Sequence, residues 1–223
     1  MSNQYQAPPK NEMDHPRLAL KGNKHANGKS IPSLKVALLA NVARLRVYTG
    51  IEGEKTISAK CDPRQLEAIA YRILHEVIPN REDHKLKMEK TSLWIGGKKR
   101  DTPGIEATIL VGRHKGKAFI SLFGFNTSKI AFPFTYGEEM KLYGADDQLL
   151  DDVDESNICA YSWCKTILGM VYPATVKNYA HPESNFNQQG GGNSGGGNSG
   201  GGGGNKSGGW GNDNNSHDDD IAF

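Results

Sequence analysis

The alternation of apolar and polar residues predicts strands in the first third of the chain. Residues 34–49 indicate two strands, of which the first is apolar on both faces. The second strand alternates, and one of its faces carries two cations and an aromatic ring, from Arg44, Arg46 and Tyr48. Residues 56–60 follow a polar turn and predict a third strand.

The clearest helix is predicted over residues 62–78. Asp62 is a favourable N-cap, Pro63 suits the first helical position, and Gln65 completes a capping-box pattern. Apolar residues then recur at helical spacing and form one face, from Leu66, Ile69, Ala70, Ile73, Leu74 and Val77. Pro79 follows the end of this helix.

A second group of strands precedes a second helix. The candidate strands lie at residues 86–95, 105–111, 117–123 and 129–134. The middle two predict a hairpin. We expect the acidic stretch up to Glu155 to form a loop or to lie on the surface, and a helix to follow from about Ser156 to Tyr172.

Strands followed by a helix therefore occur twice along the chain. This order predicts an α+β fold with antiparallel sheets and two helices, and it argues against a Rossmann-type alternation. The predicted arrangement is similar to that of the Whirly-type single-strand binders. A five-stranded OB-fold barrel is the alternative architecture.

Composition divides the chain into four segments. We expect a flexible N-terminal arm over residues 1–30, a folded core over 31–178, a disordered Gly/Asn/Ser-rich linker over 179–217 and an acidic tip over 218–223. The core, at about 150 residues, is long enough for one domain with a hydrophobic interior.

Charge is distributed unevenly, although the formal net charge is only +2. Residues 81–129 carry eleven Lys or Arg against five Asp or Glu. A basic region of this kind indicates a polyanionic partner, and a solvated charged surface is the alternative interpretation.

Cysteine usage and hydropathy argue against several classes of protein. Cys61, Cys159 and Cys164 have neither CxxC nor Cys/His spacing, so we expect no disulfide scaffold, no zinc site and no cofactor. The N-terminus lacks the apolar core of a signal peptide, and no apolar run approaches the length of a transmembrane segment. We therefore expect no membrane contact and a cytoplasmic location.

The last residues combine a polar linker with an acidic and apolar tip. Residues 190–211 are mostly glycine, asparagine and serine and have too little apolar surface to fold. The chain then ends in Asp218, Asp219, Asp220, Ile221, Ala222 and Phe223. We expect Phe223 to enter an apolar pocket on a partner protein, whose cations would contact the carboxylates.

This tail resembles the C-terminal tail of bacterial single-stranded DNA-binding proteins, which end in several Asp, an apolar residue, Pro and Phe. Ala222 stands where that family has Pro, and the resemblance covers roughly the last 35 residues. The core lacks the family's recognisable stretches, which suits a bacteriophage protein that uses the host's tail signal. The resemblance implies that replication, recombination and repair proteins bind Asp218, Asp219, Asp220, Ile221 and Phe223.

Binding of single strands without sequence preference needs cations along the phosphates and aromatic faces on which bases stack. Both kinds of residue occur on the predicted strands and in the loops between them. We expect contacts to single-stranded DNA from Arg44, Arg46, Tyr48, Lys60, Trp94, Lys98, Lys99, Arg100, Arg113, Lys115, Lys117, Phe119 and Phe123. Burial in the core is the alternative for Trp94, Phe119 and Phe123, and a solvated basic loop is the alternative for residues 98–100.

The expected function is therefore non-enzymatic binding of single-stranded DNA together with recruitment of partner proteins. No P-loop, nucleophile elbow, HExxH or dinucleotide fingerprint is present. A metal-dependent nuclease is the less favoured alternative, and its carboxylates would be Asp146, Asp147, Asp151, Asp152 and Asp154. An RNA-binding chaperone is the other alternative. Single-strand binders often form homo-oligomers, but the sequence identifies no interface.

Overall fold

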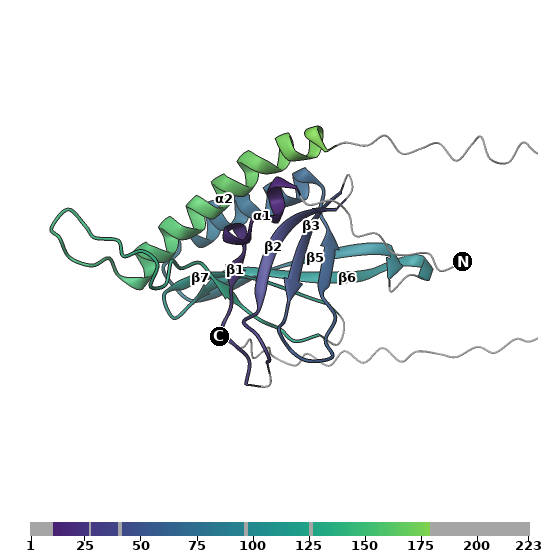
Figure 1. Ribbon diagram of the computed structural model, residues 1–223, viewed down its shortest axis with the longest axis horizontal. Coiled ribbons are helices and arrows are strands. Elements are labelled where there is room, and N and C mark those ends of the chain that lie inside the picture. Colours follow the sequence, from purple (N-terminus) through teal and green to yellow (C-terminus); the bar gives the residue numbers. More distant parts are fainter. Residues whose placement is uncertain (1–10, 27, 40–41, 96–97, 125–126, 179–223) are drawn as a thin grey trace, which may run out of the picture. The chain divides into compact units, whose positions relative to one another are not determined.

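A computed structural model describes residues 11–26, 28–39, 42–95, 98–124 and 127–178 (Figure 1). The described chain is α+β, with two four-stranded antiparallel sheets and two α-helices. The strands of each sheet precede one of the helices in sequence, so the expected order of strands followed by a helix, twice, is confirmed.

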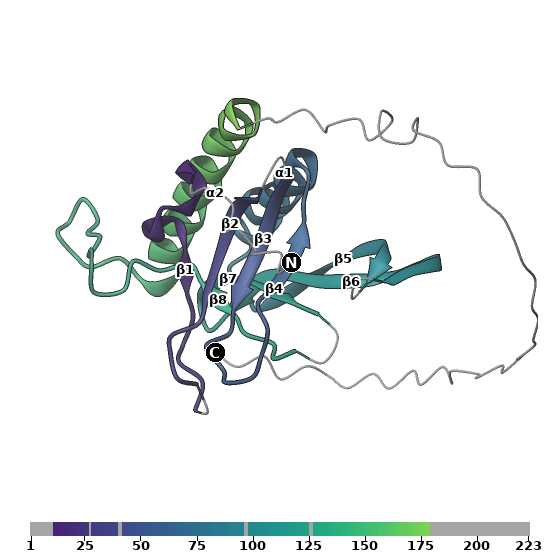
Figure 2. The ribbon, with the colours of Figure 1, turned by 45° about the vertical axis from the view of Figure 1, so that its right-hand side comes forward.

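The first sheet keeps the sequence order of its strands in space. It contains β1 (Leu20–Lys21), β2 (Ser33–Leu39), β3 (Val42–Tyr48) and β4 (Ile57–Lys60). β2 and β3 pair along their whole length, from Ser33 opposite Tyr48 to Leu39 opposite Val42. Figure 2 shows these strands side by side. The predicted strands over 34–49 and 56–60 are confirmed.

The second sheet is built around a long hairpin. Its strands are β5 (His84–Ile95), β6 (Lys98–His114), β7 (Lys117–Phe123) and β8 (Phe132–Pro133). β7 pairs with β6 only from Thr108 to His114, so the part of the hairpin beyond Thr108 is a two-stranded ribbon (Figure 2).

The first helix begins where the sequence predicts it. α1 (Pro63–Arg72) has Asp62 as its N-cap, and Asp62 and Gln65 form both hydrogen bonds of a capping box. A π-helical segment, η3 (Ile73–Val77), continues it, so the predicted helix over 62–78 is confirmed.

The second helix, α2 (Asp152–Lys177), is longer than predicted. Asp151 caps its N-terminus by accepting a hydrogen bond from the backbone N–H of Asp154. The last residues of the acidic stretch therefore form no loop, although Asp151 and Asp152 do lie on the surface. Carboxylates suit the positive end of the helix macrodipole, so acidic residues here begin the helix instead of delaying it.

One hydrophobic core joins both sheets and both helices. β3 and β4 bury alternate residues, whereas β7 and residues 107–113 of β6 are buried on both faces. β5 contributes the partly buried Leu86 and Met88, and each helix buries one side. Core residues from these elements include Val36, Leu45, Val47, Ile109, Val111, Ile120, Ile69, Ile73, Cys164 and Ile167.

The described residues ahead of β2 differ from the predicted flexible arm. A short 3-10 helix, η1 (Glu12–Asp14), begins at an Asn11 capping box, and Met13 is fully buried. The Asn11 side-chain amide also donates a hydrogen bond to the Leu38 carbonyl oxygen at 2.8 Å. The arm prediction is wrong for this part, because one large apolar side chain is enough to anchor a segment that lacks periodicity.

The described strands form two open sheets and no closed barrel, which the alternative OB fold would require. Within the described part of the chain, no helix is both long enough and apolar enough to cross a membrane.

Candidate nucleic-acid interface

The cations that the alternation of apolar and polar residues in β3 predicts lie together on the outer face of the first sheet. Leu45 and Val47 are buried in the core, and Arg44, Arg46 and Tyr48 point to the opposite side, since successive side chains of a strand alternate. The predicted grouping of these three residues on one face is confirmed.

The strand register extends this group across three strands. Arg46 lies opposite Lys35 of β2 on one side and opposite Ser58 of β4 on the other. Arg44 lies opposite Lys60 of β4. We call the surface formed by Lys35, Arg44, Arg46, Tyr48, Ser58 and Lys60 the basic face.

The basic face holds donors that the described residues leave unpaired. The Nε atoms of Arg44 and Arg46 are buried and have no hydrogen-bond partner, and the same is true of the Ser58 Oγ. Among the described residues neither arginine has a carboxylate within ion-pair distance, whereas Lys35 contacts Asp14 at 3.2 Å. A buried polar group without a partner costs free energy. Both arginine side chains are half-buried, so the outer part of each guanidinium can meet an anionic group such as a phosphate.

Tyr48 places an aromatic ring at the end of this row. Its side chain is 49% exposed, and its hydroxyl accepts a hydrogen bond from Ser30 Oγ at 3.1 Å. A ring that is anchored through its hydroxyl and open to solvent suits stacking of a nucleic-acid base.

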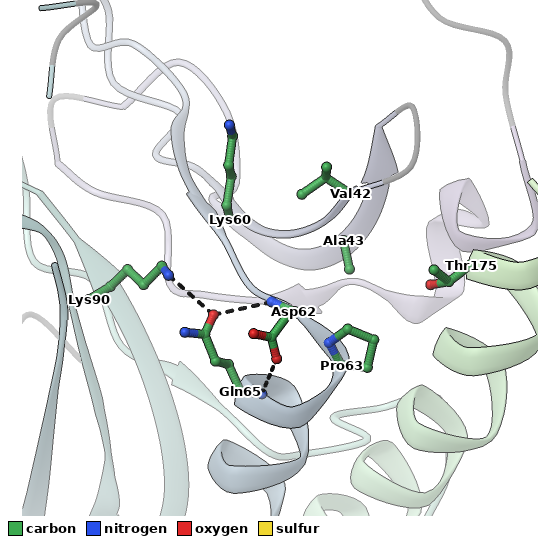
Figure 3. A pocket seen from close by; sticks show the side chains of 8 residues that line it. All are labelled: Val42, Ala43, Lys60, Asp62, Pro63, Gln65, Lys90 and Thr175. Carbon is green, nitrogen blue, oxygen red and sulfur yellow. Dashed lines mark hydrogen bonds between the residues drawn. The ribbon is translucent and has the colours of Figure 1, made fainter. Parts of the chain in front are cut away.

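A pocket of about 270 Å³ continues the basic face at Lys60 (Figure 3). On its wall, Lys90 Nζ donates a hydrogen bond to Gln65 Oε1 at 3.2 Å, and the backbone N–H of Asp62 donates to the same oxygen at 3.1 Å. The pocket is slightly smaller than typical small-molecule sites. Its two lysines outnumber its one carboxylate, from Asp62, so the lining adds net positive charge beside Arg44.

The predicted residues of the second sheet are divided among different environments. Trp94 is 60% exposed and lies opposite Lys99 on the ribbon of the β5–β6 hairpin. Residues 98–100 are exposed, but they belong to β6, so the interpretation as a loop is wrong for them. These four residues share one ribbon and lie on a different sheet from the basic face.

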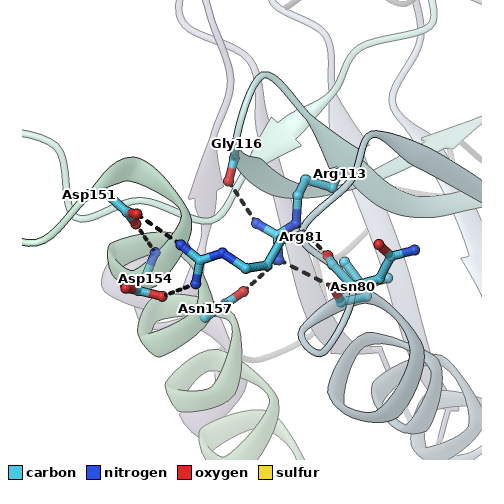
Figure 4. A network of polar contacts seen from close by, with 8 residues as sticks. Asn80, Arg81, Arg113, Gly116, Asp151, Asp154 and Asn157 are labelled. Carbon is cyan, nitrogen blue, oxygen red and sulfur yellow. Dashed lines mark hydrogen bonds and ion pairs between the residues drawn. The ribbon is translucent and has the colours of Figure 1, made fainter.

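Arg113 is structural, and its assignment as a DNA contact is wrong. The side chain is 1% exposed. Its guanidinium donates to the carbonyl oxygens of Asn80 at 2.8 Å, Gly116 at 2.6 Å and Val77 at 3.2 Å, and to Asn157 Oδ1 at 2.6 Å (Figure 4). Burial is the main cause that lowers the pKa of the Arg113 guanidinium, and the positive charge of Arg81 lowers this pKa further. Every donor nitrogen is engaged, so none faces a ligand.

The remaining cations near this network contact the acidic stretch. Arg81 bridges Asp151 and Asp154, each at 2.8 Å, and Lys117 lies 3.5 Å from Asp152. The carboxylates that the nuclease alternative would use at the start of α2 thus serve as a helix cap and in ion pairs. Within the described residues, no group of three or more His, Cys, Asp or Glu side chains is placed to hold a metal ion.

The two aromatic residues of β7 that were predicted to stack on DNA bases are buried or half-buried. Phe119 is fully buried in a small cluster with Leu110 and Ala131, so its assignment as a stacking residue is wrong. Phe123 is half-buried at the edge of this cluster, with Lys129 Nζ 5.2 Å from its ring centroid. Lys115 lies in the β6–β7 turn, where its backbone N–H donates to Asp83 Oδ2 at 3.1 Å.

The residues of the acidic tip, 218–223, lie outside the residues that the structure describes.

Sequence reasoning missed three residues of this region, namely Lys35, Ser58 and Lys90. β2 and β4 carry Lys35 and Ser58 at positions that face Arg46 only in the observed register. The alternation within β3 was visible in the sequence, but the pairing register between strands was not. Lys90 joins the pocket from the other sheet.

Comparisons with known proteins identify no relative. No protein-family model, no curated protein and no solved structure matches the chain.

Proposed function

We propose that this protein binds single-stranded DNA without sequence preference through the basic face and has no enzymatic activity. The observation that carries this proposal is the pair of arginines, Arg44 and Arg46, beside the exposed ring of Tyr48. Their buried Nε donors have no partner among the residues that the structure describes. Phosphates would satisfy the arginines, and a base would stack on Tyr48.

The spacing of the cations on the basic face suits an extended single strand of DNA. Side chains two residues apart on β3 are about 6.7 Å apart, and neighbouring strands lie about 4.8 Å apart. Arg44 and Arg46 therefore present cations at intervals comparable to those between successive phosphates. Lys60 and its pocket would extend the path towards Lys90.

The acidic tip gives the protein a second role in this proposal. Residues 218–223 would recruit replication, recombination and repair proteins, as the resemblance to bacterial tails implies. About 40 linker residues would have a root-mean-square span of roughly 35 Å, so the tip would reach a partner while the core remains on DNA. This role suits the cytoplasm of a bacterial or phage-infected bacterial cell.

The two sheets also support a finer proposal about the fold. Each four-stranded antiparallel sheet precedes a helix in sequence, and this order favours a Whirly-type arrangement over an OB barrel. A crystal structure of the full chain tests this assignment by showing whether the sheets and helices are arranged as in Whirly proteins.

Titration of a fluorescent dT oligomer with the full-length protein at several salt concentrations tests the proposal. Replacing both Arg44 and Arg46 by Gln should weaken binding and reduce the slope of log K against log salt by about 1.4, at about 0.7 per lost phosphate contact. The variant Lys98→Gln/Lys99→Gln is the control, because it removes two exposed cations from the hairpin.

The result that overturns the proposal is a basic-face variant that binds like the unmodified protein. Tighter binding of an rU oligomer than of dT would support the RNA-binding chaperone instead.

The acidic tip is tested separately with Phe223→Ala. This variant should keep its affinity for DNA and lose binding to a purified repair protein that recognises bacterial tails of this kind.

A further inference from the structure

α2 exposes apolar and aromatic side chains towards both ends of one face, with Lys165 and Gly169 between them. Ile158, Tyr161, Tyr172 and Val176 are 42%, 52%, 46% and 76% exposed. With about 100° of rotation per residue, they lie within roughly 40° of Lys165 around the helix axis. We call the stripe formed by Ile158, Tyr161, Lys165, Gly169, Tyr172 and Val176 the outer stripe of α2.

The opposite side of α2 is already used by the core. Its buried residues are Ser156, Cys159, Ala160, Cys164, Ile167, Val171 and Ala174. A helix on a protein surface is normally polar on its solvent side, and a helix that is apolar all round is normally covered. The outer stripe therefore indicates a partner.

The outer stripe is nearly symmetric about Ile167. Ile158 and Val176 lie nine residues before and after it, and Lys165 and Gly169 lie two residues before and after it. Tyr161 lies six residues before this centre and Tyr172 five residues after it. A second α2 packed antiparallel on the stripe would therefore bring like against like: Ile158 against Val176, and Tyr161 against Tyr172.

The middle of the stripe has room for this contact. A Cβ added at Gly169 would meet nothing within 4 Å, so the Lys165 stem of a second copy fits there. In one chain Lys165 Nζ already lies 5.5 Å from the Tyr161 ring centroid. In the antiparallel pair the ammonium would sit between aromatic rings, which favours cation–π contact.

The helix dipoles favour the same orientation. The charged groups at the two ends of α2 already pair within the chain, Asp152 with Lys117, Asp154 with Arg81 and Lys177 with Glu12. The dipoles of two antiparallel helices oppose each other, which is favourable, whereas those of a parallel pair would repel.

We infer that the outer stripe of α2 is a self-association surface, on which a second copy of this chain packs antiparallel about a two-fold axis near Ile167. Each copy would contribute the same patch, as in an isologous dimer. The stripe spans about 27 Å, at 1.5 Å per residue. One helix pair is small for a permanent interface, so the dimer should be weak and concentration-dependent.

Sedimentation velocity of the full-length protein over a range of concentrations, without DNA, tests association. The expected result is a reversible monomer–dimer equilibrium that Val176→Glu weakens at least tenfold. Thr166→Glu is the matched control, because Thr166 is exposed on the same helix but lies about 100° from Lys165. A monomer at every concentration, or equal dimerisation of both variants, overturns the inference.

Cross-linking tests the orientation. Proteins carrying Ile158→Cys and Val176→Cys are mixed and treated with a short bis-maleimide. Antiparallel packing predicts a cross-link between the two different variants and little between copies of Val176→Cys, whose thiols would lie at opposite ends. Burial raises the pKa of the native Cys159 thiol to about 11 and that of Cys164 to about 12, which keeps both unreactive. Efficient linkage of Val176→Cys to itself contradicts the antiparallel arrangement.

Discussion

Arg46 and Arg113 show how differently two arginines on strands are used in this protein. Arg113 lies in the second sheet, is fully enclosed, and donates to acceptors from the η3 region, the β6–β7 turn and α2. Arg46 lies on the outer face of the first sheet, and its buried Nε has no partner among the described residues. The sequence predicted both as DNA contacts.

The difference lies in where the acceptors come from. The chain itself supplies four acceptors to Arg113, so this cation stabilises the fold. The described residues supply none to the Nε of Arg44 or Arg46, so these cations remain available to an external anion. A cation without internal acceptors is therefore a better indicator of a binding surface than a cation in a basic stretch of sequence.

The largest expected effect is on the stability of the Arg113 region. Arg113→Met should lower the free energy of unfolding by about 2–4 kcal/mol, because charge-assisted hydrogen bonds are lost and buried carbonyl oxygens lose their donor. Urea denaturation followed by circular dichroism measures this change. A loss below about 0.5 kcal/mol would contradict the structural role.

A smaller effect is expected at Tyr48. Tyr48→Ala should weaken binding of a dT oligomer by about 1–3 kcal/mol without changing its salt dependence, since stacking releases no counterions. Tyr48→Phe should retain most of the affinity, because it keeps the ring and loses only the hydrogen bond from Ser30. Equal losses in both variants would assign the effect to the hydroxyl and not to stacking.

The smallest effect is expected on the stability of the basic face. Arg44→Met should change the free energy of unfolding by no more than about 0.5 kcal/mol, or raise it slightly, because it removes a buried donor for which the described part of the chain holds no partner. The same urea denaturation compares it directly with Arg113→Met. A loss as large as that of Arg113→Met would mean that Arg44 has a structural role and would remove the contrast between the two regions.

Local patterns predicted the parts of the fold that local chemistry determines. The capping box of Asp62 and Gln65 fixed the start of α1, and the alternation of β3 placed Arg44, Arg46 and Tyr48 on one face. Both features depend on residues within a few positions of each other, so they can be deduced without knowing the tertiary structure.

Other features depend on contacts between distant parts of the chain. Arg113 is buried because α2 supplies Asn157 44 residues later in the sequence. Met13 anchors a polar N-terminal segment, and Phe119 is enclosed in a cluster that includes Ala131. The sequence pattern within each of these segments does not identify such distant partners. For the same reason the sequence did not predict that Lys35 and Ser58 lie beside Arg46, because their positions depend on strand register.

Photo-cross-linking to DNA tests the central claim most directly. The full-length protein is irradiated in complex with a dT oligomer that contains 5-iodouracil, and the modified peptides are identified by mass spectrometry. Binding through the basic face predicts cross-links at Tyr48. Cross-links confined to Trp94 or to the tyrosines of α2, with Tyr48 unmodified, would contradict the assignment of the basic face as the DNA-binding surface.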